Sequence, residues 1–70
     1  MLARLQITPA EIKSLRRSRG ESVEVFGELF SRDGRTVNDW EQGRRQPDQF
    51  VIRAMRAMIA TGQREPIFGH

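Results

Sequence analysis

The stretch Ser22–Pro47, SVEVFGELFSRDGRTVNDWEQGRRQP, decides the expected fold. Ser22 and Asp33 are residue types that cap the free amides at the start of a helix. They predict a first helix over residues 23–30 and a second over residues 34–42. Two short helices joined by a tight corner form a supersecondary unit that DNA-binding proteins use.

Apolar residues at helical spacing indicate which side of each helix is buried. In the first helix these residues are Phe26, Leu29 and Phe30, and in the second they are Val37 and Trp40. We expect Trp40 to lie in the core with Phe26 and Val37, and we do not expect it to stack on bases.

Two glycines have expected structural roles in this stretch. Gly27 lies between the apolar residues of the first helix, where glycine costs about 1 kcal/mol relative to alanine. A close approach by another part of the backbone would explain its presence. Gly43 is expected to end the second helix in the left-handed conformation.

The opposite side of the 34–42 helix is polar and supplies the candidate base-reading residues. They are Gly34, Arg35, Asn38, Asp39 and Gln42. Arg35 suits a bidentate contact to guanine, and Asn38 suits adenine. The alternative for each is a contact with phosphate or with solvent. Asp39 either accepts a hydrogen bond from cytosine or orients Arg35, one turn earlier, and we favour the second role. Gly34 either allows a close backbone approach or merely fills space.

The loop after this helix is basic and contains Arg44 and Arg45 before Pro47. Both arginines are expected to face phosphate groups, contacts that set affinity and register without reading sequence directly. The alternative is an exposed basic loop with no ligand. The net charge of +3 is compatible with either interpretation.

The flanking segments predict two more helices. Thr8 and Glu11 form a capping-box pattern for a helix over residues 9–19. A helix over residues 48–61 is apolar nearly all round, so one side is expected to close the core. The remaining apolar surface is expected to contact a second copy of the chain, making a homodimer.

The whole chain is expected to be one all-α domain of four helices over residues 1–62, with a tail over residues 63–70. Ile67 and Phe68 of that tail would either contact a partner or fray. No stretch alternates apolar and polar residues for long enough to predict strands.

Composition excludes several classes of protein. The chain has no cysteine and a single histidine, His70, so neither disulfides nor a cysteine- or histidine-rich metal site is expected. No carboxylate is paired with a histidine or cysteine in a catalytic pattern, so we expect neither an enzyme nor a cofactor. No apolar run is long enough for a membrane span, and a cytoplasmic location is expected.

The residues from Thr36 to Pro47 that carry the clearest motif are Thr36-Val37, Trp40-Glu41, Gly43-Arg44 and Pro47. This pattern resembles the end of the helix-turn-helix in the lambda-repressor-like family, of the Cro/XRE type. The preceding stretch with Ser22, Phe26-Gly27 and Phe30 is similar to the helix before it, and the resemblance covers roughly residues 7–60.

The resemblance implies a compact helical domain that binds operator DNA, usually as a dimer. It implies phosphate contacts at Ser22 and Arg44, and a salt bridge between Arg16 and Glu41. The chain departs from the family pattern at three positions. Val23 replaces the usual phosphate-binding glutamine, Ser31 the usual glycine of the corner, and Arg32 the usual apolar residue after it.

The sequence thus predicts a dimeric transcriptional regulator, most simply a repressor, that reads double-stranded DNA with residues 34–42 in the major groove. The candidate DNA-binding set is Ser22, Asp33, Gly34, Arg35, Asn38, Asp39, Gln42, Arg44 and Arg45. The alternative is a protein–protein module on the same fold, such as an antitoxin that binds a toxin. Val23 and Asp39 favour this alternative.

Overall fold

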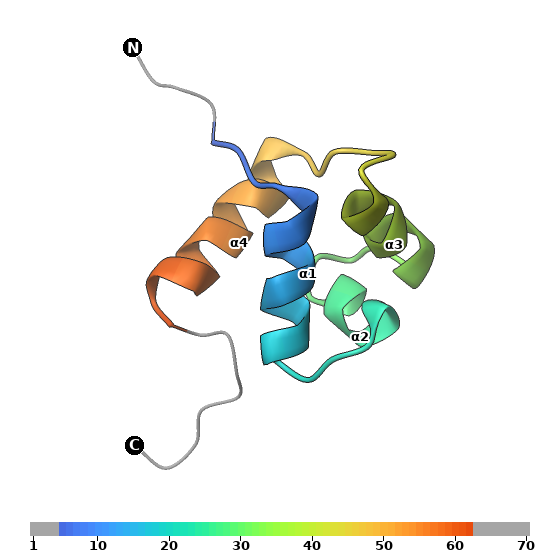
Figure 1. Ribbon diagram of the computed structural model, residues 1–70, viewed down its shortest axis with the longest axis horizontal. Helices are drawn as coiled ribbons and strands as arrows, with labels where there is room; N and C mark the ends of the chain where they lie inside the picture. The colour runs from blue at the N-terminus through green and yellow to red at the C-terminus, as the bar shows by residue number, and fades with distance from the viewer. Residues whose placement is uncertain (1–4, 63–70) are drawn as a thin grey trace.

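The computed structural model describes residues 5–62, and within that range it contains four helices and no strand (Figure 1). The helices are α1 (Pro9–Ser18), α2 (Val23–Glu28), α3 (Gly34–Gln42) and α4 (Gln49–Ala60). Helix α1 lies between α4 on one side and the α2–α3 pair on the other. The predicted all-α, four-helix architecture is therefore confirmed.

Each helix begins at a side-chain cap. Thr8, Ser22, Asp33 and Asp48 each accept a hydrogen bond from the backbone N–H three residues later. The capping box at Thr8 is complete, because Glu11 accepts from the Thr8 N–H at 2.9 Å. The predicted bounds of α3 are reproduced, whereas the other three helices are one or two residues shorter than predicted.

The core is formed by apolar side chains from all four helices. Phe26, Val37, Val51 and Met55 are fully buried, and Trp40 is 2% exposed. The ring of the buried Phe30 packs edge to face against two neighbours, and its centroid lies 5.3 Å from that of Phe26 and 6.3 Å from that of Trp40. Such edge-to-face pairs add to the stabilisation that the burial itself provides. Helix α3 is thus anchored by Val37 and Trp40, as the sequence predicted.

The corner between α2 and α3 explains two unusual residues. A Cβ atom on Gly27 would lie 2.5 Å from the carbonyl oxygen of Arg32, which confirms the expected close backbone approach. Ser31 adopts a left-handed conformation with φ of 58°, where the family usually has glycine. The Arg32 N–H donates to the Gly27 carbonyl at 2.9 Å, so the helix end keeps its closing hydrogen bond despite the bulkier residue.

The prediction that Leu29 lies on the buried side of α2 is wrong, because its side chain is 48% exposed. Helix α2 ends at Glu28, and the N–H groups of Leu29 and Phe30 donate to residues three positions earlier. This tighter final turn changes the angle between successive side chains. Phe30 therefore points into the core while Leu29 faces solvent.

Helix α4 buries Val51, Ile52 and Met55 against the rest of the domain. The apolar surface that α4 leaves exposed is modest: Phe50 is 77% exposed, and Met58 and Ile59 are partly buried. Whether a second copy covers this surface stays a prediction.

The segment before α1 is attached to α4. Leu5 and the Gln49 side chain exchange two hydrogen bonds, and Arg56 donates to the Gln6 carbonyl and to the Glu11 carboxylate. Ile7 packs against the core. Ile67 and Phe68, for which a partner contact or fraying was predicted, lie outside the described residues. Across residues 5–62, no helix is both long and apolar enough to cross a membrane.

Candidate nucleic-acid interface

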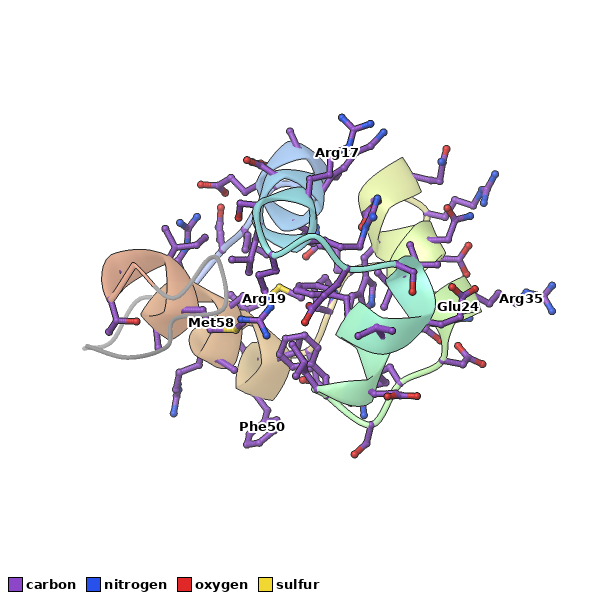
Figure 2. The ribbon with its side chains drawn as sticks, turned by 90° about the horizontal axis from the view of Figure 1, so that it is seen from below. Arg17, Arg19, Glu24, Arg35, Phe50 and Met58 are labelled. Carbon is purple, nitrogen blue, oxygen red and sulfur yellow. The ribbon has the colours of Figure 1, made fainter. Side chains whose placement is uncertain are left out.

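The N-terminal end of α3 carries Arg35, the principal candidate for base contact. Asp33 caps the helix by accepting from the Thr36 N–H at 2.8 Å, and this hydrogen bonding to Thr36 lowers the pKa of the Asp33 carboxyl. Arg35 is exposed and points away from the body of the domain (Figure 2). It has no ion-pair partner within the described part of the chain. Its guanidinium is therefore available to an external acceptor.

Gly34 does not lie on the exposed surface that the sequence pattern predicted. It is buried beneath the Glu24 side chain of α2, and a Cβ at Gly34 would lie 2.9 Å from the Glu24 Oε2 atom. The glycine at this position leaves room for Glu24, which explains why the backbone here approaches another part of the same chain. The expected exposure of Gly34 is thus wrong, whereas its place in the DNA-binding set stays a prediction.

Glu24 is a residue of this surface that the sequence reasoning missed. It lies in the first turn of α2, and its side chain covers Gly34 at the start of α3. The carboxylate favours the positive end of the α3 dipole. It also places an acid against Gly34, the residue that precedes Arg35. Glycine at the first position of α3 was the available signal, because it indicates space for an overlying side chain.

The middle of α3 fits the prediction. Asn38 and Gln42 are exposed, whereas Val37 and Trp40 on the opposite side are buried. An α-helix fits the major groove of B-DNA, where an exposed amide can bond base edges.

Asp39 occupies a different role from the one predicted. Its carboxylate contacts Arg44 Nη1 at 3.3 Å and Arg45 Nε at 3.8 Å, and no contact joins it to Arg35. The cause is the chain reversal at Gly43, which has φ of 78°. This reversal lets the Arg44 N–H donate to the Asp39 carbonyl at 3.0 Å and returns both arginines toward the helix.

The same reversal leaves Arg44 and Arg45 well exposed, with 65% of each side chain accessible. Each arginine has more donors than its contact with Asp39 uses. Asp39 therefore restrains the two side chains without consuming their capacity to bind phosphate.

A salt bridge fixes the angle of α3 relative to α1. Arg16 donates through Nε and Nη2 to the two oxygens of Glu41, at 2.7 and 3.0 Å, and through Nη1 to the Glu21 carbonyl. The Glu41 hydrogen bonds raise the pKa of Arg16. The pair is only 16% and 5% exposed, so solvent screens it weakly. The Arg16–Glu41 pair expected from the family resemblance is confirmed.

Ser22 lies at the start of α2, close to this salt bridge through the Glu21 carbonyl. Its hydroxyl accepts from the Val25 N–H at 3.2 Å and remains exposed, so it can still donate to an external oxygen. Ser22, Arg35, Asn38, Gln42, Arg44 and Arg45 are thus all exposed on the α2–α3 unit and the loop after it. No group of three or more His, Cys, Asp or Glu side chains suited to a metal ion occurs among residues 5–62.

No protein-family model matches the chain. The chain is similar to antitoxin HigA-2 of Vibrio cholerae, with 36% identity over 62 residues. The match covers 89% of this chain and 56% of the antitoxin, so the chain spans little more than half the length of that relative.

Proposed function

We propose that this chain binds double-stranded DNA in a sequence-selective manner and represses transcription from the site it occupies. The observation that carries the proposal is the division of α3 into two sides. Val37 and Trp40 hold one side in the core, while Arg35 and Asn38 stand exposed on the other. In this docking mode the N-terminal residues of the recognition helix meet base edges.

In this proposal, one set of residues contacts bases and another set contacts phosphates. Arg35 and Asn38 contact bases, and Ser22, Arg44 and Arg45 contact phosphates on either side. Asp33 contributes by capping α3, not by touching DNA. A bidentate arginine–guanine contact accounts for about 1–3 kcal/mol of discrimination. Phosphate contacts add affinity that falls steeply with salt concentration.

We further propose that the active form is a homodimer in which the exposed part of α4, with Phe50 at its start, contacts a second copy. Two recognition helices about 34–36 Å apart would then meet two half-sites separated by one turn of DNA. Occupancy of an operator by such a dimer would block polymerase, which is the simplest route to repression.

The decisive experiment is selection of bound sequences from a random pool of duplex DNA. The expected result is a palindrome with a fixed spacing between its half-sites, which supports both the groove contact and the dimer. In the same assay, Arg35→Ala should relax the preference at one base position. Arg44→Ala should weaken binding to all sequences alike. Identical behaviour of the two variants would contradict the assigned roles, and absence of any enriched sequence would contradict selective binding.

The second candidate function is an antitoxin that binds a toxin protein, and the similarity to antitoxin HigA-2 favours it. The two functions are compatible, because one surface can bind DNA while another binds a protein. Co-expression of the chain with the product of each neighbouring gene tests this candidate. A product that arrests growth only when the chain is absent, and that co-purifies with it, is the expected toxin. If no neighbour behaves in this way, the candidate fails while the DNA-binding proposal stands.

A further inference from the structure

The basic side chains of residues 5–62 fall into two groups. One group has acidic partners within 4 Å: Arg16, Arg19, Arg32, Arg44, Arg45 and Arg56. The other group has no ion-pair partner in the same part of the chain: Lys13, Arg17, Arg35 and Arg53. Arg35 belongs to the proposed base-reading surface. Lys13 and Arg17 have no role in the function described so far.

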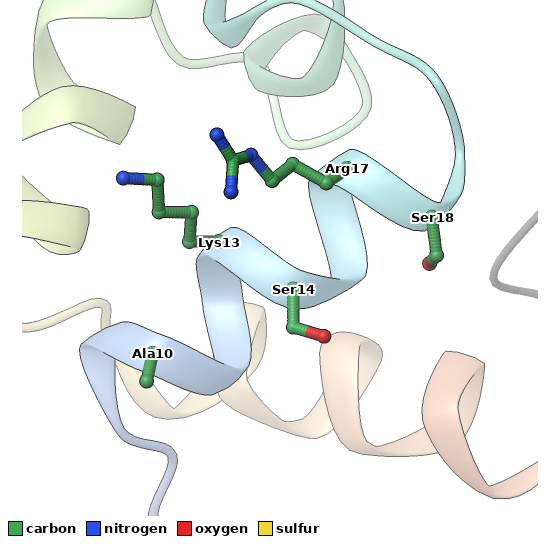
Figure 3. Close-up of a pocket in the computed structure, with 5 residues that line it drawn as sticks. All are labelled: Ala10, Lys13, Ser14, Arg17 and Ser18. Atoms are coloured by element: carbon green, nitrogen blue, oxygen red, sulfur yellow. The ribbon is translucent and has the colours of Figure 1, made fainter.

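Lys13 and Arg17 lie four residues apart on α1, and both side chains are exposed. Residues at this spacing are neighbours on one side of a helix, where two like charges destabilise the helix. Figure 3 shows that the two cationic groups extend in the same direction from α1. Arg17 lies in the last turn of α1, where a cation favours the helix dipole. Lys13, one turn earlier, has no such compensation.

This side of α1 borders the candidate interface. Arg16, between the two cations in sequence, is bonded to Glu41 of α3. At the other end of α1, Pro9 lies 3.8 Å from the position that a Cβ on Gly43 would take. Lys13 thus lies on the stretch of α1 between its contacts with Glu41 and with the turn that precedes Arg44 and Arg45.

The surface beside the two cations is open. Ala10, Ser14 and Ser18 line a shallow hollow together with Lys13 and Arg17 (Figure 3). Their small side chains leave the cations unobstructed, and no acidic residue lines the hollow. A backbone of regularly spaced anions can approach such a surface without a steric or electrostatic barrier.

We propose that Lys13 and Arg17 form a phosphate-binding strip on α1 that contacts the sugar–phosphate backbone of the same duplex, outside the helix-turn-helix; this inference rests on the proposed function. The strip lies on the helix whose first residue, Pro9, packs near the Gly43 turn that precedes Arg44 and Arg45. It adds affinity without sequence preference, because phosphate contacts do not read bases directly. The partner is DNA and not an acidic protein segment, because the strip adjoins the surface on which α3 presents Arg35 and Asn38.

The test measures binding to a mixed-sequence duplex between about 50 and 200 mM salt. Binding weakens as salt increases, and each lost phosphate contact reduces the steepness of log K against log salt by about 0.9. The double variant Lys13→Gln/Arg17→Gln should reduce this steepness by about 1.8, twice the value for one contact, and weaken binding at low salt. The base preference obtained from a random pool should not change. Arg53→Gln is the control for net charge and is compared with each single variant, because Arg53 is an exposed cation of α4 without an acidic partner among residues 5–62. Light scattering checks that this variant keeps the oligomeric state of the unaltered chain, since α4 carries the proposed dimer contact.

Circular dichroism of each variant establishes that the helices are retained, and both single variants should show about half the slope change. An unchanged slope in the double variant overturns the strip while leaving the proposed function intact. A loss in Arg53→Gln equal to that of either single variant also overturns it, because the effect would then reflect net charge. If the unaltered chain shows no salt-sensitive DNA binding at all, the proposed function fails and the strip fails with it.

Discussion

The arginines at the two ends of α3 differ in their contacts with acidic side chains. At the N-terminal end, Arg35 has no ion-pair partner among residues 5–62, and Glu24 covers Gly34 instead of bonding to Arg35. At the C-terminal end, Asp39 contacts both Arg44 and Arg45. One end therefore presents an exposed cation near an acid that covers Gly34, and the other presents two cations in contact with an acid of the same helix.

The difference teaches how one helix can separate selectivity from affinity. An exposed arginine at the start of the helix can bond guanine through two donors at once, a contact that discriminates between bases. Restrained cations lose less side-chain entropy when they meet phosphate. The N-terminal end is thus suited to discrimination and the C-terminal end to general attachment, which matches the proposed roles of Arg35 and Arg44.

Trp40→Ala should have the largest effect and should abolish the difference between the two ends. Truncating a buried tryptophan costs about 3–5 kcal/mol, which is a large part of the stability of a domain this small. Chemical denaturation followed by circular dichroism measures the loss. A variant as stable as the unaltered chain would show that α3 is not anchored through Trp40. Val25→Ala, at a 46% exposed site on α2 outside the proposed DNA and dimer contacts, is the control and should change stability by no more than about 0.5 kcal/mol.

Glu24→Gln tests the N-terminal end. Removing the carboxylate near Arg35 should tighten DNA binding by about 0.5–1 kcal/mol, because an unpaired negative charge no longer opposes the phosphates. The gain should shrink as salt increases. Titration of the variant at two salt concentrations measures it. Glu28→Gln, an exposed acid at the other end of α2, is the control. Equal gains in both variants would mean that Glu24 has no special position.

Asp39→Asn tests the C-terminal end and should have a smaller effect on DNA binding, within about 0.5 kcal/mol. Freed arginines reach phosphate more easily but lose their restraint, and exposed ion pairs contribute only about 0–1 kcal/mol. The same titration measures this result. A gain larger than that of Glu24→Gln would reverse our interpretation of the two ends.

Acidification should loosen the N-terminal end of α3 before the C-terminal end. The folded-state pKa of Asp33 is lowered, so the stability it contributes is complete above its ordinary pKa and is lost as the pH falls through the lower folded value. The left-handed turn at Gly43 depends on backbone hydrogen bonds, which do not titrate. Amide hydrogen exchange below about pH 4 should therefore rise at Thr36 before Arg44. Simultaneous loss of both would indicate global unfolding instead.

Much of the fold was predictable because short-range patterns determine it. The capping residues Thr8, Ser22 and Asp33 predict where helices begin, and helical spacing predicts that Val37 and Trp40 are core residues. The Arg16–Glu41 salt bridge came from the family resemblance. Spacing failed at Leu29, where the tighter final turn of α2 changes the side-chain angle.

The candidate site was less predictable, because its errors depend on contacts between elements. Asp39 is one helical turn from Arg35, so the sequence favoured that pair. The chain reversal at Gly43 instead brings Arg44 and Arg45 to the same carboxylate. Gly34 indicates that space is left for an overlying side chain, but that Glu24 fills the space depends on the angle between α2 and α3, which no local pattern specifies.

The attachment of Leu5 and Gln6 to α4 has a consequence for the smallest portion of this chain that can fold. Cutting at Thr8, where the helical region begins, would remove the partners of Gln49 and one of the two acceptors of Arg56. The side chain of Ile7 would leave the core at the same time. A shortened version designed for engineering should therefore start no later than Leu5, so that these anchors are retained.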